Sequence, residues 1–227
     1  MFAAIARRYD LNNRVHSLWR DQQWRRRAVS LCRVTPEDAV LDVACGTGDL
    51  AEAFAQAAPA RVVGVDFTGE MLDLARRKAG RRHRPAGVPE PEYLLGDAVA
   101  LAFGQASFDI VSIGFGLRNI AEPRRALCEF RRVLRPGGRL VVLEFSRPRH
   151  PVLRRLSDWY CRVVMPITAT LIAVDRSGAY RYLPCSVPAF ADRQRLMGMM
   201  ASAGFSGLTQ HPMTCGICVA YLGEAAR

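Results

Sequence analysis

The chain has 227 residues, half of them hydrophobic, and a formal net charge of +11 that comes almost entirely from arginine, since Lys78 is the only lysine. This length fits one substantial hydrophobic core, and no apolar run reaches the ~18 residues that cross a bilayer. The N-terminus has no secretory signal pattern, so we expect a cytoplasmic protein of one domain, residues 1–227. Most of these arginines are expected to be solvated on helix faces, and attraction to an anionic membrane surface or to a nucleic acid is the alternative.

A first helical region is predicted over 14–33. After it, the hydrophobic periodicity alternates between that of strands and that of helices. The predicted strands span 39–44, 61–66, 92–98, 108–116, 139–148, 205–211 and 214–222, with intervening helices that include 69–80, 122–135 and 190–203. Residues 150–190 do not continue this alternation. They are interpreted as an insertion that covers the site, with an ordinary packing excursion as the alternative. Fully apolar strands alternating with helices predict an α/β fold with a doubly wound, mostly parallel sheet of seven strands.

The seven cysteines are scattered and odd in number, which favours a reducing compartment over a disulfide framework. Cys215 and Cys218 have the spacing of a redox motif, but they lie in an apolar run that predicts a strand. A separation of three residues places two strand side chains on opposite faces. No second cysteine pair completes a zinc site, so we predict no bound metal.

A glycine-rich turn follows the first strand. Gly46, Gly48 and Ala51 fit the pattern G-x-G-x-x-G/A, and Asp66 ends the next strand, where an acid binds ribose hydroxyls. On these residues alone, an NAD-dependent oxidoreductase stays open. Asp42 favours another cofactor, because a carboxylate at the end of the first strand attracts an ammonium group and repels a pyrophosphate.

Two later features fit a cofactor that carries both an amino acid and adenine. Asp97, after the third strand, is placed to accept a hydrogen bond from the adenine amine, and Ala98 offers a backbone N–H to the ring. The helix, the glycine turn at 136–138 and the strand that follow have the arrangement found in S-adenosylmethionine enzymes. In this order, the features resemble the Rossmann-like class I methyltransferase fold.

Longer segments make the resemblance more specific. They are ARRYDLNNRVHSLWRDQQWRRRAV, LDVACGTGDLA, VVGVDFTGEMLDLARRK, GDAVALAF, FDIVSIGFGLRNI, LRPGGRLVVLEFSRP, YRYLPCSVPAF and MMASAGF. Together they resemble the ubiquinone/menaquinone biosynthesis C-methyltransferase family, with GFGLRN and LEFSRP the most specific of them. The resemblance implies S-adenosyl-L-methionine as the cofactor and methyl transfer to a ring carbon of a polyprenylated hydroquinone, either demethylmenaquinol or a related benzoquinol.

The resemblance also implies a set of site residues. The predicted cofactor-binding residues are Asp42, Gly46, Thr47, Gly48, Asp66, Phe67, Met71, Asp97, Ala98 and Gly114. Arg118 and Asn119 are the predicted catalytic residues, which orient a water or a hydroquinone oxygen at the carboxyl edge of the sheet. An arginine there stabilises a phenolate better than it accepts a proton. Asp10 is expected either to close over the cofactor or to pack against the first helix.

Three positions depart from the family pattern. Gly114 stands where a serine is common, which removes a side-chain contact to the cofactor. Cys215 replaces a glycine of a TGGI segment, and the segment 182–190 differs from the usual acidic, serine-containing version. These departures leave open a methyltransferase that acts on another aromatic or polyketide ring. A non-catalytic scaffold in a quinone-synthesis complex is the second alternative.

The expected partner is a lipophilic prenylated quinol. Because a polyprenyl tail resides in the bilayer, we expect transient contact with the inner face of the membrane through the N-terminal helix that carries Trp19 and Trp24. A nucleic-acid partner is disfavoured, since the fourth strand lacks an N/D-P-P-Y/W motif for stacking on a flipped base. A homo-oligomer stays open.

Overall fold

The computed structural model describes residue 10, residues 13–164 and residues 192–226. Seven strands form one sheet in the order β3-β2-β1-β4-β5-β7-β6. Their bounds are Ala39–Val43 (β1), Arg61–Asp66 (β2), Glu92–Leu95 (β3), Phe108–Gly114 (β4), Leu134–Phe145 (β5), Phe205–Met213 (β6) and Cys218–Ala225 (β7). Strands β1 to β5 pair in parallel, and β7 is antiparallel to both of its neighbours. The predicted mostly parallel, seven-stranded α/β sheet is confirmed.

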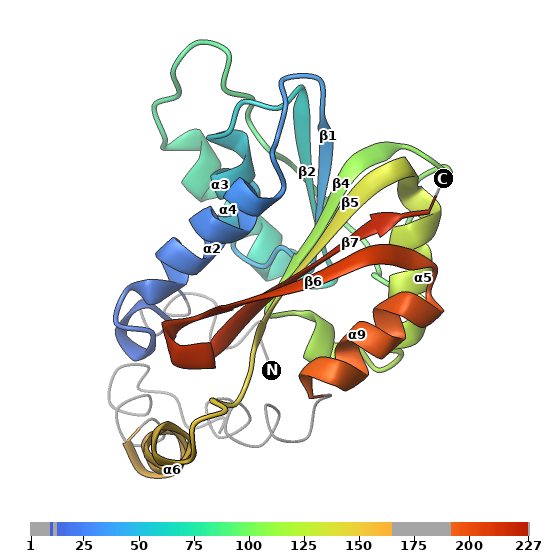
Figure 1. Ribbon diagram of the computed structural model, residues 1–227. Coiled ribbons are helices and arrows are strands. Elements are labelled where there is room, and N and C mark those ends of the chain that lie inside the picture. The colour runs from blue at the N-terminus through green and yellow to red at the C-terminus, as the bar shows by residue number, and fades with distance from the viewer. Residues whose placement is uncertain (1–9, 11–12, 165–191, 227) are drawn as a thin grey trace.

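Helices cover both faces of this sheet (Figure 1). Their bounds are Arg20–Leu31 (α2), Asp49–Ala55 (α3) and Gly69–Gly80 (α4) on one face, and Pro123–Val133 (α5) and Arg193–Ser202 (α9) on the other. Because strand side chains alternate, Val40 and Ile110 join the core under α2 to α4, whereas Leu41 and Val111 join the core under α5 and α9. The central strands are therefore buried on both faces, which explains their continuous apolar runs.

The predicted N-terminal helical region, 14–33, is helical but not continuous. Residues 13–16 are helical, and α2 begins only at Arg20, because Leu18 and Trp19 have φ angles of 52° and 58°. These angles lie in the left-handed region, which interrupts a right-handed helix. The two residues turn outward with exposed side chains, and the chain enters α2 in a new direction.

The C-terminal strands also differ from the prediction. Cys215 lies outside the strand, in a short 3-10 turn over Thr214–Gly216 (η3), with a φ of 55°, and β7 begins only at Cys218. The prediction that Cys215 and Cys218 lie on opposite faces of one strand is therefore wrong. Cys218 is buried in the sheet, whereas Cys215 is exposed.

The predicted covering segment 150–190 is described only in its first part. Residues Pro151–Trp159 form α6, and Tyr160–Val164 continue as a π-helix (η2). Residues 165–191, which include the segment 182–190, lie outside the described residues. In the described part of the chain, no helix combines the length and apolarity needed to cross a bilayer.

Candidate functional site

A cleft of about 490 Å³ opens at the carboxyl ends of the parallel strands, which is the size of a small-molecule site. It forms beside β1 and β4, where the chain leaves adjacent strands toward opposite faces of the sheet. The predicted residues that line it are Gly46, Asp66, Phe67, Met71, Asp97, Ala98, Gly114 and Asn119. The lining residues do not include Asp42, Thr47, Gly48 or Arg118, whose surroundings are described below.

The glycine turn forms one wall of the cleft. Gly46 and Gly48 have φ angles of 56° and 82°, which glycine adopts without steric cost. Gly48 also packs on Tyr93, so that a β-carbon added at Gly48 would overlap the tyrosine hydroxyl. The second glycine is thus required by its conformation and by the close approach of the Tyr93 ring.

Asp66 fixes this turn to the end of β2. Its Oδ2 accepts a hydrogen bond from the Gly46 N–H at 2.8 Å, and its Oδ1 accepts one from the Thr68 N–H at 2.8 Å. A carboxylate has about four acceptor positions, so Asp66 retains capacity for hydroxyl groups of a ligand in the cleft. Asp66 therefore both shapes the turn and offers acceptors to the ligand.

Asp97 and Ala98 bring a second acceptor group to the cleft from the end of β3. The Asp97 Oδ1 accepts a hydrogen bond from the Val99 N–H at 3.0 Å, which orders this short loop. Phe67 is 77% exposed beside them and offers an apolar ring. Two carboxylates with free acceptor capacity and an adjacent apolar wall fit a nucleoside, with hydroxyls on one carboxylate and an aromatic amine on the other.

Asp42 lies beneath the cleft and is 1% exposed. Its Oδ1 accepts a hydrogen bond from the Ser112 hydroxyl at 2.7 Å, while its buried Oδ2 has no hydrogen-bond partner among the described residues. Burial raises the pKa of Asp42 to about 7, against the opposing effect of the Ser112 hydrogen bond. Asp42 is thus a carboxyl group that changes its charge near neutral pH, and its second oxygen is buried without a hydrogen-bond partner among the described residues.

Asp42→Asn is expected to flatten the pH dependence of stability. A raised folded-state pKa gives stability that is complete below the unfolded pKa, near 4, and is lost as the pH rises through about 7. Between pH 6 and pH 8 the free energy of unfolding of the wild type should therefore fall by about 1.4 kcal/mol through this carboxyl. The asparagine variant lacks this loss. Urea unfolding at both pH values measures this difference, and parallel pH profiles for the two proteins would contradict it.

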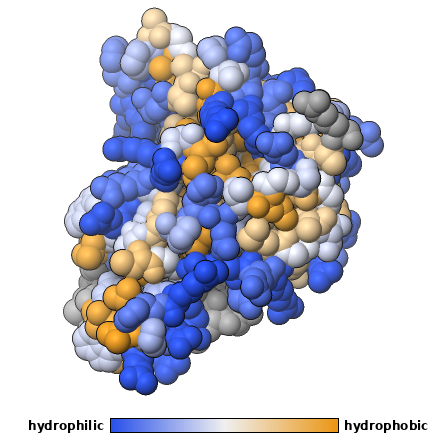
Figure 2. All heavy atoms as spheres, in the orientation of Figure 1, coloured by the Kyte–Doolittle hydropathy of each residue, from blue (hydrophilic) through white to orange (hydrophobic). Residues whose placement is uncertain are grey.

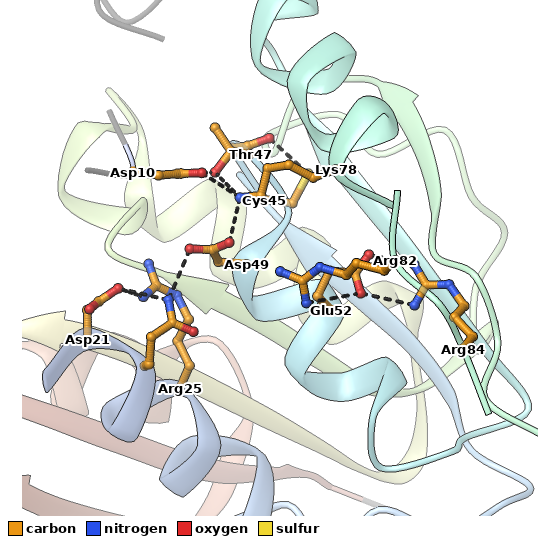
Figure 3. Close-up of polar contacts among 12 residues, drawn as sticks. Asp10, Asp21, Arg25, Cys45, Thr47, Asp49, Glu52, Lys78, Arg82 and Arg84 are labelled. Carbon is orange, nitrogen blue, oxygen red and sulfur yellow. Dashed lines mark hydrogen bonds and ion pairs between the residues drawn. The ribbon is translucent and has the colours of Figure 1, made fainter. Parts of the chain in front are cut away.

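Thr47 belongs to a charged cluster behind the glycine turn. Figure 3 shows the Lys78 ammonium between the carboxylates of Asp10 and Asp49, with Thr47 beside it. The Nζ atom lies 2.6 Å from Asp10 Oδ2, 2.5 Å from Asp49 Oδ1 and 3.1 Å from Thr47 Oγ1. The Thr47 hydroxyl in turn donates a hydrogen bond to Asp10 Oδ1 at 2.6 Å. Lys78 therefore links the N-terminal residue Asp10, the glycine turn and the start of α3.

Lys78→Met is expected to destabilise the protein by about 2 kcal/mol, because it leaves the buried Asp49 carboxylate and Asp10 without their cation. Lys78→Arg should restore only part of this loss. The lysine ammonium directs its N–H donors at three acceptors that surround one nitrogen atom, and a planar guanidinium cannot reproduce this arrangement. Arg77→Met, on the exposed side of the same helix, is the matched control. Urea denaturation measures both effects, and equal stability of the Lys78→Met and Arg77→Met variants would contradict the assignment.

Arg118 lies beside the cleft with its side chain 9% exposed, and Asn119 lines the cleft. The Arg118 guanidinium donates hydrogen bonds to Glu144 Oε2 at 2.8 Å and to the Phe115 carbonyl at 2.7 Å, and it lies 5.3 Å from the centre of the Phe145 ring. Glu144 is 1% exposed. Arg118 thus holds the 3-10 turn Leu117–Asn119 (η1) against β5, and Asn119 at the end of η1 faces the cleft.

Sequence reasoning missed several lining residues. They are Val43, Ala44, Thr68, Gly96, Val99, Phe115, Gly116, Ile120, Ala121 and Glu122. Ala44 and Phe115 follow β1 and β4 with left-handed φ angles of 52° and 59°, which cost a residue other than glycine roughly 1–3 kcal/mol. No sequence pattern predicts a left-handed alanine or phenylalanine. The backbone is therefore strained on both sides of the crevice, as it is at some positions away from it, such as Ala58 and Ala106.

Comparisons with known proteins agree with this geometry. The model of the ubiE/COQ5 methyltransferase family matches residues 1–225. A demethylmenaquinone methyltransferase from Thermus thermophilus is 47% identical over 99% of both chains, and one from Deinococcus radiodurans is 44% identical over 99% of this chain and 90% of its own. A ubiquinone/menaquinone biosynthesis C-methyltransferase from Geotalea daltonii is 39% identical over 99% of this chain and 94% of its own.

Solved structures show the same fold. A SAM-dependent methyltransferase from Thermotoga maritima superposes with a TM-score of 0.65 at 19% identity, over 99% of this chain and 97% of that chain. A SAM-dependent methyltransferase from Aquifex aeolicus gives a TM-score of 0.60 at 16% identity, over 87% and 88% of the two chains. The mostly parallel sheet of seven strands, with helices on both faces, is the fold expected from the resemblance to class I methyltransferases.

Proposed function

Because the chain belongs to the ubiE/COQ5 methyltransferase family and uses S-adenosyl-L-methionine as its cofactor, we propose that it methylates a ring carbon of demethylmenaquinol, a prenylated naphthoquinol. The observation that carries this proposal is the 47% identity, over nearly the whole of both chains, with a protein named demethylmenaquinone methyltransferase. The cleft supports it, because its donor and acceptor groups suit the nucleoside part of the cofactor.

The residues around the cleft divide into those that would hold the cofactor and those that face the substrate. Asp66 would accept hydrogen bonds from ribose hydroxyls, Asp97 would accept one from the adenine amine, and the free oxygen of Asp42 would attract the ammonium group. When bound, the cofactor supplies an electrophilic methyl group on its sulfonium. The protein's own part is to align a ring carbon with that methyl group and to exclude water.

Arg118 has two roles in this proposal. It positions Asn119 through the ion pair with Glu144, so that the asparagine amide can orient a water or a quinol oxygen. Its positive charge, one residue from the cleft, also stabilises an ionised quinol hydroxyl, which makes the adjacent ring carbon nucleophilic. Sub-ångström placement matters for such alignment, so a buried ion pair suits the task of holding the turn.

Methyl transfer to defined quinols tests the proposal. The protein is incubated with isotopically labelled S-adenosyl-L-methionine and either a reduced demethylnaphthoquinone or a reduced benzoquinone, each with a short prenyl chain. Mass spectrometry should find the labelled methyl group on a ring carbon of the naphthoquinol. Labelling only of the benzoquinol would contradict the ring assignment, and cofactor binding without methylation of either quinol would favour the scaffold alternative.

The location that we propose follows from the substrate. A prenylated quinol lies in the bilayer, so a cytoplasmic enzyme must reach the inner face of the membrane to meet it. The described residues contain no helix that could cross the bilayer, and contact at the surface would serve this purpose. Trp24 cannot contact the membrane as expected, because it is 4% exposed and its indole N–H donates a hydrogen bond to Thr214 Oγ1.

A further inference from the structure

Exposed apolar side chains gather at one corner of the molecule. We call the six side chains that form this surface the apolar ridge: Leu18, Trp19, Val152, Leu156, Trp159 and Val163, each at least 45% exposed. In Figure 1, α6 stands away from the sheet, and Figure 2, in the same orientation, shows hydrophobic residues at that corner with hydrophilic residues around them. No residue of α6 is buried, so this helix contributes nothing to either core.

A direct contact joins the two segments of the ridge. The Nδ1 atom of His16 lies 3.3 Å from the hydroxyl of Tyr160, and that hydroxyl also reaches the His16 carbonyl at 3.5 Å. His16 immediately precedes the turn that carries Leu18 and Trp19, and Tyr160 immediately follows Trp159. The exposed turn and the end of α6 therefore lie side by side and form one surface.

The helical segment has one apolar face, with arginines beside it and behind it. Val152, Leu156, Trp159 and Val163 are separated by four, three and four residues, which places them on one helical face. Five arginines flank or occupy the rest of the segment 147–164, at positions 147, 149, 154, 155 and 162, against the single acidic residue Asp158. The segment thus has an apolar face bordered by a strong excess of positive charge.

We infer that the apolar ridge docks on the surface of a bilayer that contains anionic lipids. This inference rests on the proposed function, since a substrate with a prenyl tail must be taken from the bilayer. An amphipathic helix with basic residues on its polar face lies in the interfacial plane, and tryptophan prefers this depth. Arginines at the border of the ridge would contact anionic headgroups. A second copy of the chain is a poorer occupant, because it would bring the same arginines against one another.

Vesicle flotation without any quinol tests the inference independently of the chemistry. Wild-type protein should bind vesicles of phosphatidylcholine and phosphatidylglycerol. Arg154→Glu with Arg155→Glu should weaken this binding more than about tenfold, because four units of charge change at the border of the ridge. Arg124→Glu with Arg125→Glu, the same change on exposed positions of α5, should leave binding within about twofold of wild type. Equal loss in both double variants, or no binding by the wild type, would overturn the inference.

Leu156→Asp distinguishes a bilayer from the two other partners that could cover the ridge, the rest of the chain or a second copy of it. It should abolish vesicle binding and leave the melting temperature unchanged. A lower melting temperature with unchanged vesicle binding would assign the ridge to packing within the chain, and loss of a dimer without vesicles would assign it to a second copy. Both results contradict membrane docking. Failure of the wild type to methylate a short-chain, water-soluble quinol analogue, with vesicle binding intact, would instead count against the proposed function.

Discussion

Replacing Arg118 by alanine is expected to lower the free energy of unfolding by about 3–5 kcal/mol, because it leaves the Glu144 carboxylate buried without a countercharge. The same change removes a hydrogen bond to the Phe115 carbonyl, which holds the turn that ends in Asn119. Urea denaturation measures the loss of stability. An alanine variant within about 1 kcal/mol of wild type would show that Glu144 finds another partner, and the account of this ion pair would be wrong.

The double variant Arg118→Met with Glu144→Met distinguishes the effect of Arg118 on protein stability from its proposed effect on methyl transfer. Replacing both members of a buried ion pair by apolar side chains of similar size is often neutral, so this double variant should recover most of the lost stability. If Arg118 also stabilises an ionised quinol, the recovered protein should bind the cofactor normally and turn over slowly. Normal turnover in the double variant would restrict Arg118 to a structural role.

Replacing Asp66 by alanine is expected to weaken cofactor binding by about 100-fold, which corresponds to about 2.8 kcal/mol. The variant loses two charge-assisted hydrogen bonds, from the N–H groups of Gly46 and Thr68, together with the acceptors proposed for the ribose. Calorimetric titration with S-adenosyl-L-methionine measures the affinity. The turnover number at saturating cofactor should change far less than the affinity, since the proposed contact of Asp66 is with the ribose and not with the quinol.

Asp73→Ala is the matched control for Asp66→Ala. Asp73 is the same residue type, lies on the nearby helix α4 and forms an exposed ion pair with Arg76. It should leave cofactor affinity within about twofold of wild type, because an exposed ion pair contributes little. Equal effects of the two alanine variants would show that the loss in Asp66→Ala comes from charge alone and not from the hydrogen bonds at the glycine turn.

Elements with continuous local patterns were predicted well from the sequence. The strand over 61–66 and the helix over 69–80 have their expected bounds, because an apolar run sets the first and Gly80 ends the second. The break at Leu18 and Trp19 could not be predicted, since neither residue type favours a left-handed conformation. The turn at Cys215 was not predicted either, because the apolar run continues through it and predicts an uninterrupted strand.

The site shows a similar division. Gly46, Asp66 and Asp97 follow strand ends at fixed spacing, so linear motifs alone predicted that they would line a cleft. The ion pairs of Arg118 with Glu144 and of Lys78 with Asp10 join residues far apart in the chain, and no local spacing encodes them. Asp42 shows a third case: its position at the crevice was expected, but its burial and raised pKa depend on the packing around β1.

A structure with S-adenosylhomocysteine bound would show whether this cleft holds the cofactor. We expect the adenine between Phe67 and Ala98, with its amine on Asp97, and the ribose hydroxyls on Asp66. We also expect the amino group of the ligand to point toward Asp42. A ligand bound away from the carboxyl ends of β1 and β4, or in the same cleft without contact to Asp66 and Asp97, would contradict this expectation.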